Sequence, residues 1–197
     1  LLPTSFDYGV TDLNGRYDAR FPLVIGKASI SDYHATRRVL TVPEIFINSS
    51  NIGSAKMALD VGIEGHQEFL RRVGFFDRLT TEIPESAKPL LPKHWSKLAT
   101  ATVAFGHGFA VQPLQGISVI GGLINGGIMT QPTFLQRDVA EADVLAKRIV
   151  KPETSEKIRY LFRPNVEEGT ASKADVIGYR VASKTGPSAK VVHGRDP

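Results

Sequence analysis

The chain has 197 residues, of which 42% are hydrophobic and 22% charged, and it contains no cysteine. This composition excludes a disordered, collagen-like or coiled-coil protein, and the length suits one domain or a large part of a bigger one. The net charge of +4 is spread along the sequence without the basic stripe that indicates nucleic-acid binding. Disulfide bonds, thiolate metal sites and cysteine nucleophiles are excluded.

The first half of the chain predicts loops and short strands followed by helices. Residues 1–40 are expected to form loops with a turn at Asn14–Gly15 and a brief strand at 23–26. A helix is predicted over 44–48 after Pro43, and a second over 52–61 ends at Gly62. A third, amphipathic helix is predicted over 64–73.

The second half adds helices and strands. Residues 80–97 are rich in proline and are predicted to cross the surface as a long loop. Helices are expected over 113–125 and 152–162, a strand-like segment over 128–135, and the best strand of the chain over 177–185. Residues 117–129 are too short and too interrupted by glycine to span a membrane, and residues 1–5 do not resemble a signal peptide. Any anchor or export signal is therefore expected upstream of this chain.

Lys184-Thr185-Gly186 ends the last predicted strand. The lysine offers charge toward a carboxylate, the threonine offers a hydroxyl, and the glycine lets a ligand backbone lie close. These are useful properties for holding a peptide-like ligand at a strand edge. Alone the tripeptide is weak evidence, since it arises by chance in about 5% of chains this long.

Ser49-Ser50-Asn51 lies between two predicted helices. Ser49 and Asn51 offer a hydroxyl for proton relay and an amide that both donates and accepts. The structural alternative is that Ser50 or Asn51 simply caps the following helix. A Ser-x-Asn triplet arises by chance in about half of chains of this size, so it too is weak alone.

In this order the two motifs resemble the second and third motifs of penicillin-binding proteins and class A β-lactamases. Longer segments extend the resemblance to class B, division-specific transpeptidases: 43–59 (PEIFINSSNIGSAKMAL), 105–108 (FGHG), 111–115 (VQPLQ), 167–170 (EEGT) and 178–182 (GYRVA). Residues 17–20 and 31–34 resemble the α-proteobacterial branch. The match covers about residues 9–195.

The resemblance implies the α+β fold of serine β-lactamases and penicillin-binding transpeptidases, an antiparallel sheet with a helical subdomain. Residues 1–197 would be one partial transpeptidase domain of septal cell-wall synthesis. Family members use a serine to attack D-Ala-D-Ala in peptidoglycan stem peptides, and β-lactams acylate the same serine. No cofactor, metal or nucleic acid is expected, and division (divisome) proteins are the expected partners of the parent protein, at the periplasmic face of the inner membrane.

Carried onto this sequence, the resemblance makes Ser49 a proton shuttle toward the leaving group and Asn51 a group that orients the substrate amide. Lys184 would sustain the electrostatics of that relay. Thr185 would bind the substrate carboxylate, and Gly186 would permit its close approach. The motifs near residues 50 and 184 are then expected to line one cleft.

Two features depart from the family pattern. No serine has a lysine three positions later, so the Ser-x-x-Lys motif and its nucleophile are missing from the 197 residues. Pro187 stands where relatives supply a backbone N–H to the oxyanion hole, and proline has none. Losing such a donor costs about 10²–10³ in rate. His107, within the glycine-rich turn, is expected to line the cleft.

Three interpretations remain open. The first is a fragment or decayed copy of a class B transpeptidase that is inactive as this chain. The second is a non-catalytic module of the same fold that binds peptidoglycan or a division partner. The third, a relative of β-lactamases or β-lactam sensors, is disfavoured by segments 43–59 and 105–115. The five histidines show no paired spacing, so no metal site is expected.

Overall fold

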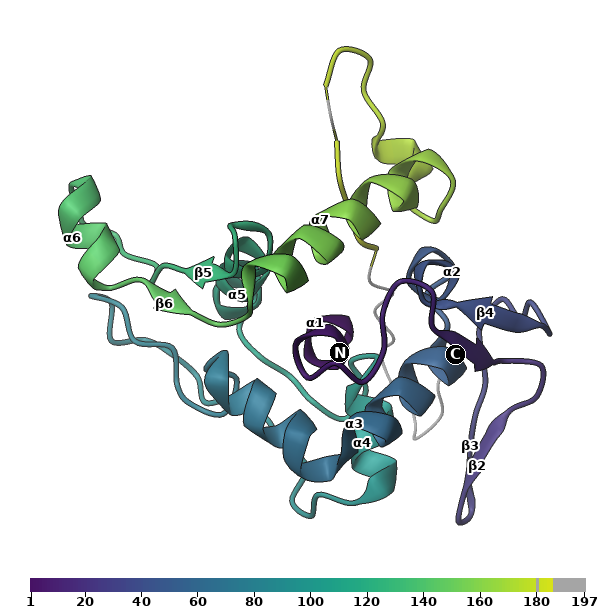
Figure 1. Ribbon diagram of the computed structural model, residues 1–197. Helices are drawn as coiled ribbons and strands as arrows, with labels where there is room; N and C mark the ends of the chain where they lie inside the picture. The colour runs from purple at the N-terminus through teal and green to yellow at the C-terminus, as the bar shows by residue number, and fades with distance from the viewer. Residues whose placement is uncertain (180, 186–197) are drawn as a thin grey trace.

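The computed structural model describes residues 1–179 and 181–185, which form helices connected by loops and short strands (Figure 1). The helices are α1 (Leu2–Asp7), α2 (Val42–Ile47), α3 (Asn51–Arg72), α4 (Lys97–Val103), α5 (Pro113–Ile124), α6 (Val139–Val144) and α7 (Pro152–Glu167), with a 3₁₀ turn at Ser172–Ala174. The strands are β1 (Arg16–Asp18), β2 (Leu23–Ile25), β3 (Ala28–Ile30), β4 (Val39–Thr41), β5 (Ile128–Met129) and β6 (Lys147–Arg148).

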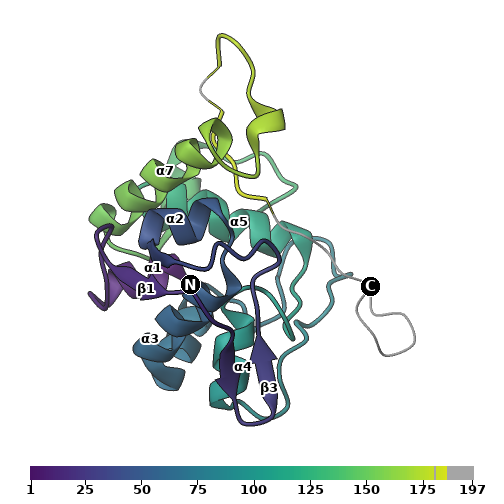
Figure 2. The same ribbon diagram turned by 90° about the vertical axis from the view of Figure 1, so that its right-hand side faces the viewer.

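The strands pair as antiparallel two-stranded ribbons: β1 with β4, β2 with β3, and β5 with β6. In the first ribbon Tyr17 lies opposite Leu40. The β2–β3 hairpin lies beside α4 (Figure 2), and Ile30 packs there with Ala55 of α3 and Ala101 of α4. This contact brings the chain leaving β3 to the start of α3, where one of the two sequence motifs lies.

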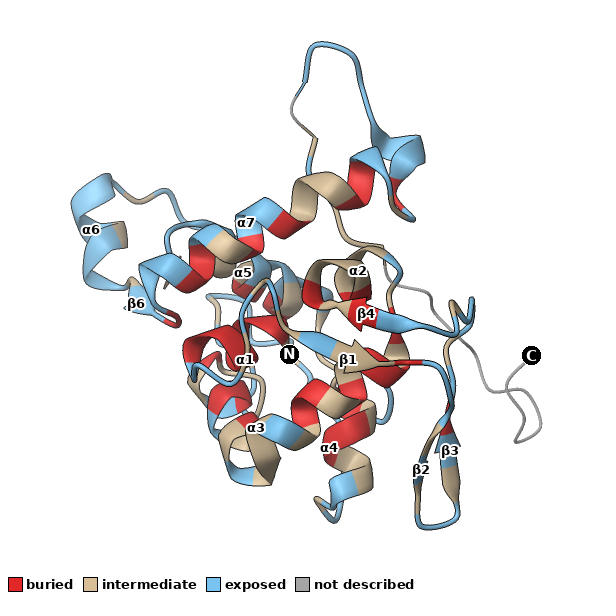
Figure 3. Cartoon of the chain, turned by 45° about the vertical axis from the view of Figure 1, so that its right-hand side comes forward, coloured by how far each residue is buried: buried red, intermediate tan, exposed pale blue. Residues whose placement is uncertain are grey.

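The main hydrophobic core forms where α1, α2, α3 and α7 meet (Figure 3). Leu40, Ile45, Met57 and Leu161 are completely or almost completely buried there. Every residue of α1 is buried, although Pro3 is followed by the polar Thr4 and Ser5. Burial of apolar side chains at about 25 cal/mol per Å² supplies most of the driving force for such packing.

A buried carboxylate fastens three of these helices together. Asp7 accepts hydrogen bonds from the Arg72 guanidinium at 2.9 Å, from the backbone N–H of Lys151 at 2.8 Å and from the Thr154 hydroxyl at 3.2 Å. Its side chain is only 5% exposed. Both carboxylate oxygens are therefore partnered, and the end of α1 is tied to the last turn of α3 and the first turn of α7.

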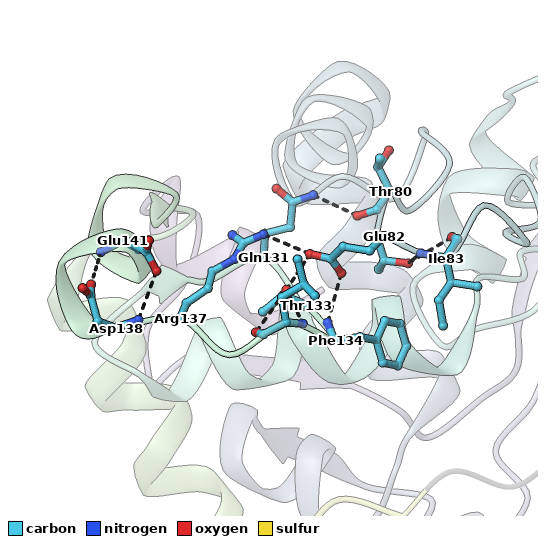
Figure 4. Close-up of polar contacts among 11 residues, drawn as sticks. Thr80, Glu82, Ile83, Gln131, Thr133, Phe134, Arg137, Asp138 and Glu141 are labelled. Carbon is cyan, nitrogen blue, oxygen red and sulfur yellow. Dashed lines mark hydrogen bonds and ion pairs between the residues drawn. The ribbon is translucent and has the colours of Figure 1, made fainter.

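A polar clasp joins the loop after α3 to the segment between β5 and α6 (Figure 4). Glu82 accepts from the Thr133 hydroxyl at 2.6 Å, the Phe134 N–H at 3.0 Å and the Arg137 guanidinium at 3.1 Å. These donors, Thr133 first among them, lower the pKa of Glu82 to about 2. The clasp therefore ties these two segments together, and its residues are not among those of the main hydrophobic core.

Most predicted helices are confirmed, and the differences have identifiable causes. The two helices expected over 52–61 and 64–73 are confirmed as the two parts of α3, which are separated at Gly62, whose φ of 82° and ψ of 168° are not helical. α1, α4 and α6 were not predicted. The helix expected to end at residue 162 continues to Glu167 past Pro164. Of the strand-like segment 128–135, only Ile128–Met129 forms a strand.

The strand predicted over 177–185 is wrong for the residues of it that the structure describes. Its backbone groups bond to the end of α7 instead of to a neighbouring strand. The Ser183 N–H donates to the Phe162 carbonyl at 3.2 Å, and the Asn165 side-chain amide donates to the Ser183 carbonyl at 2.9 Å. Backbone pairing is a long-range property, so an apolar β-branched run does not by itself make a strand.

Acid pH is expected to destabilise the chain through His66 on α3. This side chain is 1% exposed and lies edge-on to Trp95, and burial lowers the pKa of His66 to about 3. Below about pH 6.5 this histidine binds a proton in the unfolded chain but stays neutral in the folded chain. The free energy of unfolding should therefore fall by up to ~1.4 kcal/mol per pH unit until about pH 3, where the folded chain is protonated as well. Urea denaturation across this range measures the slope.

The control for this prediction is an exposed histidine. His66→Leu should flatten the acid slope of the free energy of unfolding, whereas His94→Leu should leave it unchanged, because His94 is exposed. An unaltered slope in the His66 variant would show that other groups cause the acid sensitivity.

Candidate active site

The two sequence motifs meet beside the end of α2. The Lys184 ammonium donates a hydrogen bond of 2.6 Å to the Ser49 hydroxyl, although the residues are 135 positions apart. The same ammonium donates to the Thr185 carbonyl at 2.9 Å. Figure 1 shows the last described residues, in yellow, running down beside α2. The predicted meeting of the two segments is thus observed.

Ser49 lies in a tight turn between two helices. α2 begins with a capping box in which Thr41 and Glu44 bond to each other's backbone N–H, and it ends at Ile47. Ser49 then adopts a φ of +53°, a left-handed conformation that is unusual outside glycine. Ser50 caps α3, because its hydroxyl accepts the Gly53 N–H at 3.0 Å. The capping alternative therefore holds for Ser50, while Ser49 faces Lys184.

Residues leaving β3 hold the other side of this turn. The Asn51 side-chain amide donates to the Ser31 carbonyl at 3.0 Å. Asp32 accepts from the Ser50 hydroxyl and from the Ile52 N–H, both at 2.9 Å. Segment 31–34 was predicted only to be part of the family resemblance, with no role for Asp32. The Asp32 side chain acts by holding other residues, and such a role has no sequence motif by which it could be recognised.

Lys184 is half-buried in this site. Its ammonium lies 5.4 Å from the centre of the Phe46 ring, within the range of a cation–π contact. Burial lowers the pKa of Lys184, because water no longer fully solvates the charged form. An ammonium with a lowered pKa gives up its proton more readily than a solvated lysine, and Ser49 lies within hydrogen-bonding distance to receive it.

Residues at and after the end of α7 hold the segment that carries Lys184 and Thr185. Asn165 is completely buried and donates to the carbonyl of Ser183, the residue before Lys184. The hydroxyls of Thr170 and Thr185 hydrogen-bond to each other. Asn165 was not predicted as a site residue. Thr170 lies in the segment 167–170 that resembles the family, but it was given no role either. These contacts fix the backbone that presents Lys184 to Ser49.

Of the remaining predicted site residues, the structure describes His107 alone. His107 is exposed on the turn after α4, where its backbone N–H donates to the Thr102 carbonyl at 3.0 Å. Within residues 1–179 and 181–185, no hydrogen bond or ion pair joins the His107 ring to either motif. Its role at the cleft stays a prediction. Gly186 and Pro187 lie outside the described residues, so their roles also stay predictions.

A separate cavity of about 250 Å³ lies near the Glu82 clasp, and both Thr80 and Gln131 line it. It shares no residue with the two motifs. In the part of the chain that the structure covers, no group of three or more His, Asp or Glu side chains could hold a metal ion. None of the described helices is long and apolar enough to cross a membrane.

Chemically, the site combines a desolvated ammonium, a hydroxyl and a carboxamide. Lys184 can attract a carboxylate and supply a proton, and Ser49 can relay it. Asn51 uses one amide hydrogen on Ser31, which leaves its second hydrogen and its carbonyl for a peptide group. This set of groups suits binding of a peptide with a free C-terminus and proton transfer to an amine.

The family model described as the penicillin binding protein transpeptidase domain matches residues 4–196. The similarity thus begins five residues earlier than Gly9, where the sequence analysis placed its start. Residues 1–8 were predicted to lie outside the family resemblance, and the match corrects this prediction for residues 4–8, most of which belong to the buried helix α1.

Among curated proteins, the chain is 36% identical over 187 residues to the probable peptidoglycan D,D-transpeptidase FtsI of Caulobacter vibrioides, covering 93% of the chain and 32% of that protein. It is 31% identical over 198 residues to the probable peptidoglycan D,D-transpeptidase PenA of Neisseria meningitidis, covering 99% of the chain and 33% of that protein. The chain therefore spans about a third of the length of these relatives.

Among solved structures, the transpeptidase domain of penicillin-binding protein 3 from Burkholderia pseudomallei superposes with a TM-score of 0.90 at 25% identity, covering 100% of this chain and 60% of that one. Penicillin-binding protein 3 from Mycobacterium tuberculosis, solved in complex with aztreonam, gives a TM-score of 0.84 at 22% identity, covering 98% and 47%. The second likeness concerns the fold alone. Together they confirm the predicted α+β, transpeptidase-like fold class.

Proposed function

Since this chain belongs to the penicillin-binding protein transpeptidase family, we propose that its Ser49–Lys184 site serves peptidoglycan D,D-transpeptidation in septal cell-wall synthesis. The observation that carries the proposal is the 2.6 Å hydrogen bond between the Lys184 ammonium and the Ser49 hydroxyl. It joins the second and third family motifs into one site. Residues 1–197 then form part of a single transpeptidase domain.

The ligand that fits this site is a peptidoglycan stem peptide ending in D-Ala-D-Ala. Its terminal carboxylate would lie toward the Lys184 charge and the Thr185 hydroxyl, which offer an ammonium and an O–H donor. The Asn51 carboxamide would pair with the amide of the penultimate residue, and Gly186 would let the peptide backbone approach. His107 and Pro187 would border this peptide at the outer edge.

The reaction assigned to the site is acyl transfer. A serine hydroxyl attacks the carbonyl between the two D-alanines, the peptide C–N bond breaks, and the departing D-alanine amine takes up a proton. Ser49 donates its hydroxyl proton to that amine and takes one from Lys184, and the proton that the attacking serine loses restores the Lys184 ammonium, so that charge and atoms balance. A neighbouring stem-peptide amine then displaces the serine and completes the cross-link.

The chain as it stands is proposed to bind this ligand without being acylated. None of its serines is followed three positions later by lysine, so the 197 residues do not include the Ser-x-x-Lys nucleophile of the family. Pro187 would also weaken the oxyanion hole, because it lacks an N–H. The lack of a Ser-x-x-Lys sequence in the 197 residues also favours a second candidate function, that of a non-catalytic module that recognises peptidoglycan or a division partner.

β-lactams are proposed as further ligands, because one relative of the same fold was solved in complex with aztreonam. We propose that the parent protein lies at the periplasmic face of the bacterial inner membrane, where peptidoglycan is assembled. Its partners there would be the division (divisome) proteins that direct septal synthesis. Neither a cofactor nor a metal enters the proposed chemistry.

Covalent labelling by a fluorescent penicillin is expected to fail. The purified chain, incubated with the label and run on a denaturing gel, should show no fluorescent band, whereas a penicillin-binding protein that carries Ser-x-x-Lys should be labelled under the same conditions. An adduct that survives denaturation, and that disappears in Ser49→Ala, would assign a substitute nucleophile and contradict the proposal.

The binding function itself is tested by calorimetric titration. A diacetylated lysyl peptide ending in D-Ala-D-Ala should bind saturably, and the peptide ending in L-Ala-L-Ala should bind roughly tenfold more weakly or worse, since its methyl groups meet the site with opposite handedness. Folded protein that binds neither peptide would remove the proposed function.

A further inference from the structure

We propose that Asp32 is a positioning residue that sets the geometry of the Ser49–Asn51 turn. It is not among the groups that would touch the substrate. Its significance for peptide binding rests on the proposed function, but its effect on the Ser49–Lys184 pair does not.

Both oxygens of the Asp32 carboxylate are committed to the turn. One accepts the Ser50 hydroxyl at 2.9 Å, and the other accepts the Ile52 backbone N–H at 2.9 Å. Two bonds from one rigid carboxylate, spanning residues 50 and 52, fix the orientation of the backbone between them. Hydrogen bonds to an ionised acceptor are roughly twice as strong as neutral ones.

The Ser50 hydroxyl is thereby locked in a double role. It donates its only hydrogen to Asp32 and accepts the Gly53 N–H at 3.0 Å, and the residue is only 2% exposed. Asp32 thus aligns the cap of α3. Its negative charge also lies at the N-terminus of this helix, where the peptide dipoles stabilise an anion.

The residue before Asp32 reinforces the same contact. The Ser31 carbonyl accepts a hydrogen of the Asn51 carboxamide at 3.0 Å. That bond also defines which end of the carboxamide is nitrogen, because a carbonyl oxygen can only accept. One short segment leaving β3 therefore sets both the backbone of the turn and the orientation of the Asn51 side chain.

The turn needs such support because Ser49 is in a costly conformation. A non-glycine residue at φ +53° typically costs about 1 kcal/mol or more and persists only where its surroundings impose it. A turn released from Asp32 can relax toward ordinary φ values, and this would carry the Ser49 hydroxyl away from Lys184. The 2.6 Å contact between them has little tolerance for such a shift.

The test compares Asp32→Ala and Asp32→Asn with the matched control Asp143→Asn. Asp143 is exposed on α6, and no hydrogen bond or ion pair of its side chain occurs among the residues that the structure describes. The pKa of Lys184 is followed by NMR of its side chain, and the affinity for the D-Ala-D-Ala peptide is followed by calorimetry. The NMR titration reports the Ser49–Lys184 pair directly, whether or not the peptide binds.

In Asp32→Ala, the pKa of Lys184 should fall below that of the unmodified chain, because the half-buried ammonium loses the Ser49 hydroxyl as an acceptor while its contacts with Phe46 and the Thr185 carbonyl remain. Peptide affinity should fall roughly tenfold or more. Asp32→Asn should be intermediate, since its carbonyl oxygen retains one of the two acceptors. Asp143→Asn should match the unmodified chain in both measurements.

The inference is overturned if folded Asp32→Ala, or folded Asp32→Asn where the alanine variant does not fold, keeps the original pKa of Lys184. A variant that is only less heat-stable, with this pKa unchanged, would likewise reduce Asp32 to a structural residue. If the unmodified chain binds no peptide, the proposed function fails, while the Lys184 titration still decides the role of Asp32.

Discussion

Replacing Asp7 by alanine is expected to lower the free energy of unfolding by about 3–5 kcal/mol. The substitution removes three hydrogen bonds at once and leaves the Arg72 guanidinium, only 27% exposed, with the longer contact of 3.6 Å to the exposed Glu68 as its one ion pair among the described residues. The Lys151 N–H and the Thr154 hydroxyl at the start of α7 also lose their acceptor. Urea denaturation of the purified variant, at neutral pH and moderate salt, measures the loss.

Two controls isolate the buried charge. Asp7→Asn keeps the shape and one acceptor oxygen, so its loss should be smaller than that of the alanine variant. Asp175→Ala removes a carboxylate that pairs with Arg163 where both side chains are partly exposed, and it should cost less than about 1 kcal/mol. An Asp7→Ala variant as stable as Asp175→Ala would contradict the role given to this carboxylate.

Removing the Lys184 ammonium is expected to weaken binding of the D-Ala-D-Ala peptide roughly 10- to 100-fold, the effect of losing a hydrogen bond to a charged group. Lys184→Met preserves the length and most of the volume of the side chain but cannot donate to Ser49 or to a carboxylate. Calorimetric titration at constant salt gives the change in Kd. The exposed Lys173, changed to methionine, controls for the loss of one positive charge nearby.

A double-mutant cycle then tests whether Ser49 and Lys184 act as one unit. Ser49→Ala should weaken peptide binding in the unmodified chain and should have much less effect in the Lys184→Met background, because the contact between them is already lost. Strict additivity of the two changes would show that the pair is not coupled in binding.

Much of the helical framework was predictable because its boundaries are set by local chemistry. Pro113 begins α5, and Gly62 breaks α3 through its positive φ, as expected from their residue types. Two missed helices had local signals as well. Ser96 caps α4, and Asp138 with Glu141 forms a capping box at α6.

Other elements depend on distant contacts that no local pattern contains. The buried helix α1 has no side-chain cap, and its polar Thr4 and Ser5 give no apolar stripe. Residues 177–185 have the composition of a strand, but in the described residues the end of α7 takes up their backbone groups. Strand formation requires a neighbour, and the sequence of one segment does not specify it.

In the candidate site, too, some residues were predictable from local motifs and others were not. Ser49, Asn51 and Lys184 were identified because two short motifs in a fixed order accompany longer similar segments. Asp32 and Asn165 were not, because their contribution is to hold other residues through side-chain bonds to a cap and to a carbonyl. Such positioning groups become visible only when the distances are known.

Chemical-shift mapping with the D-Ala-D-Ala peptide tests the central claim most directly. Adding the peptide to isotopically labelled chain should shift the signals of Ser49, Asn51, Lys184 and Thr185 together, with one common Kd. The claim would be contradicted if those signals stayed still while residues around the separate cavity, such as Gln115, shifted instead.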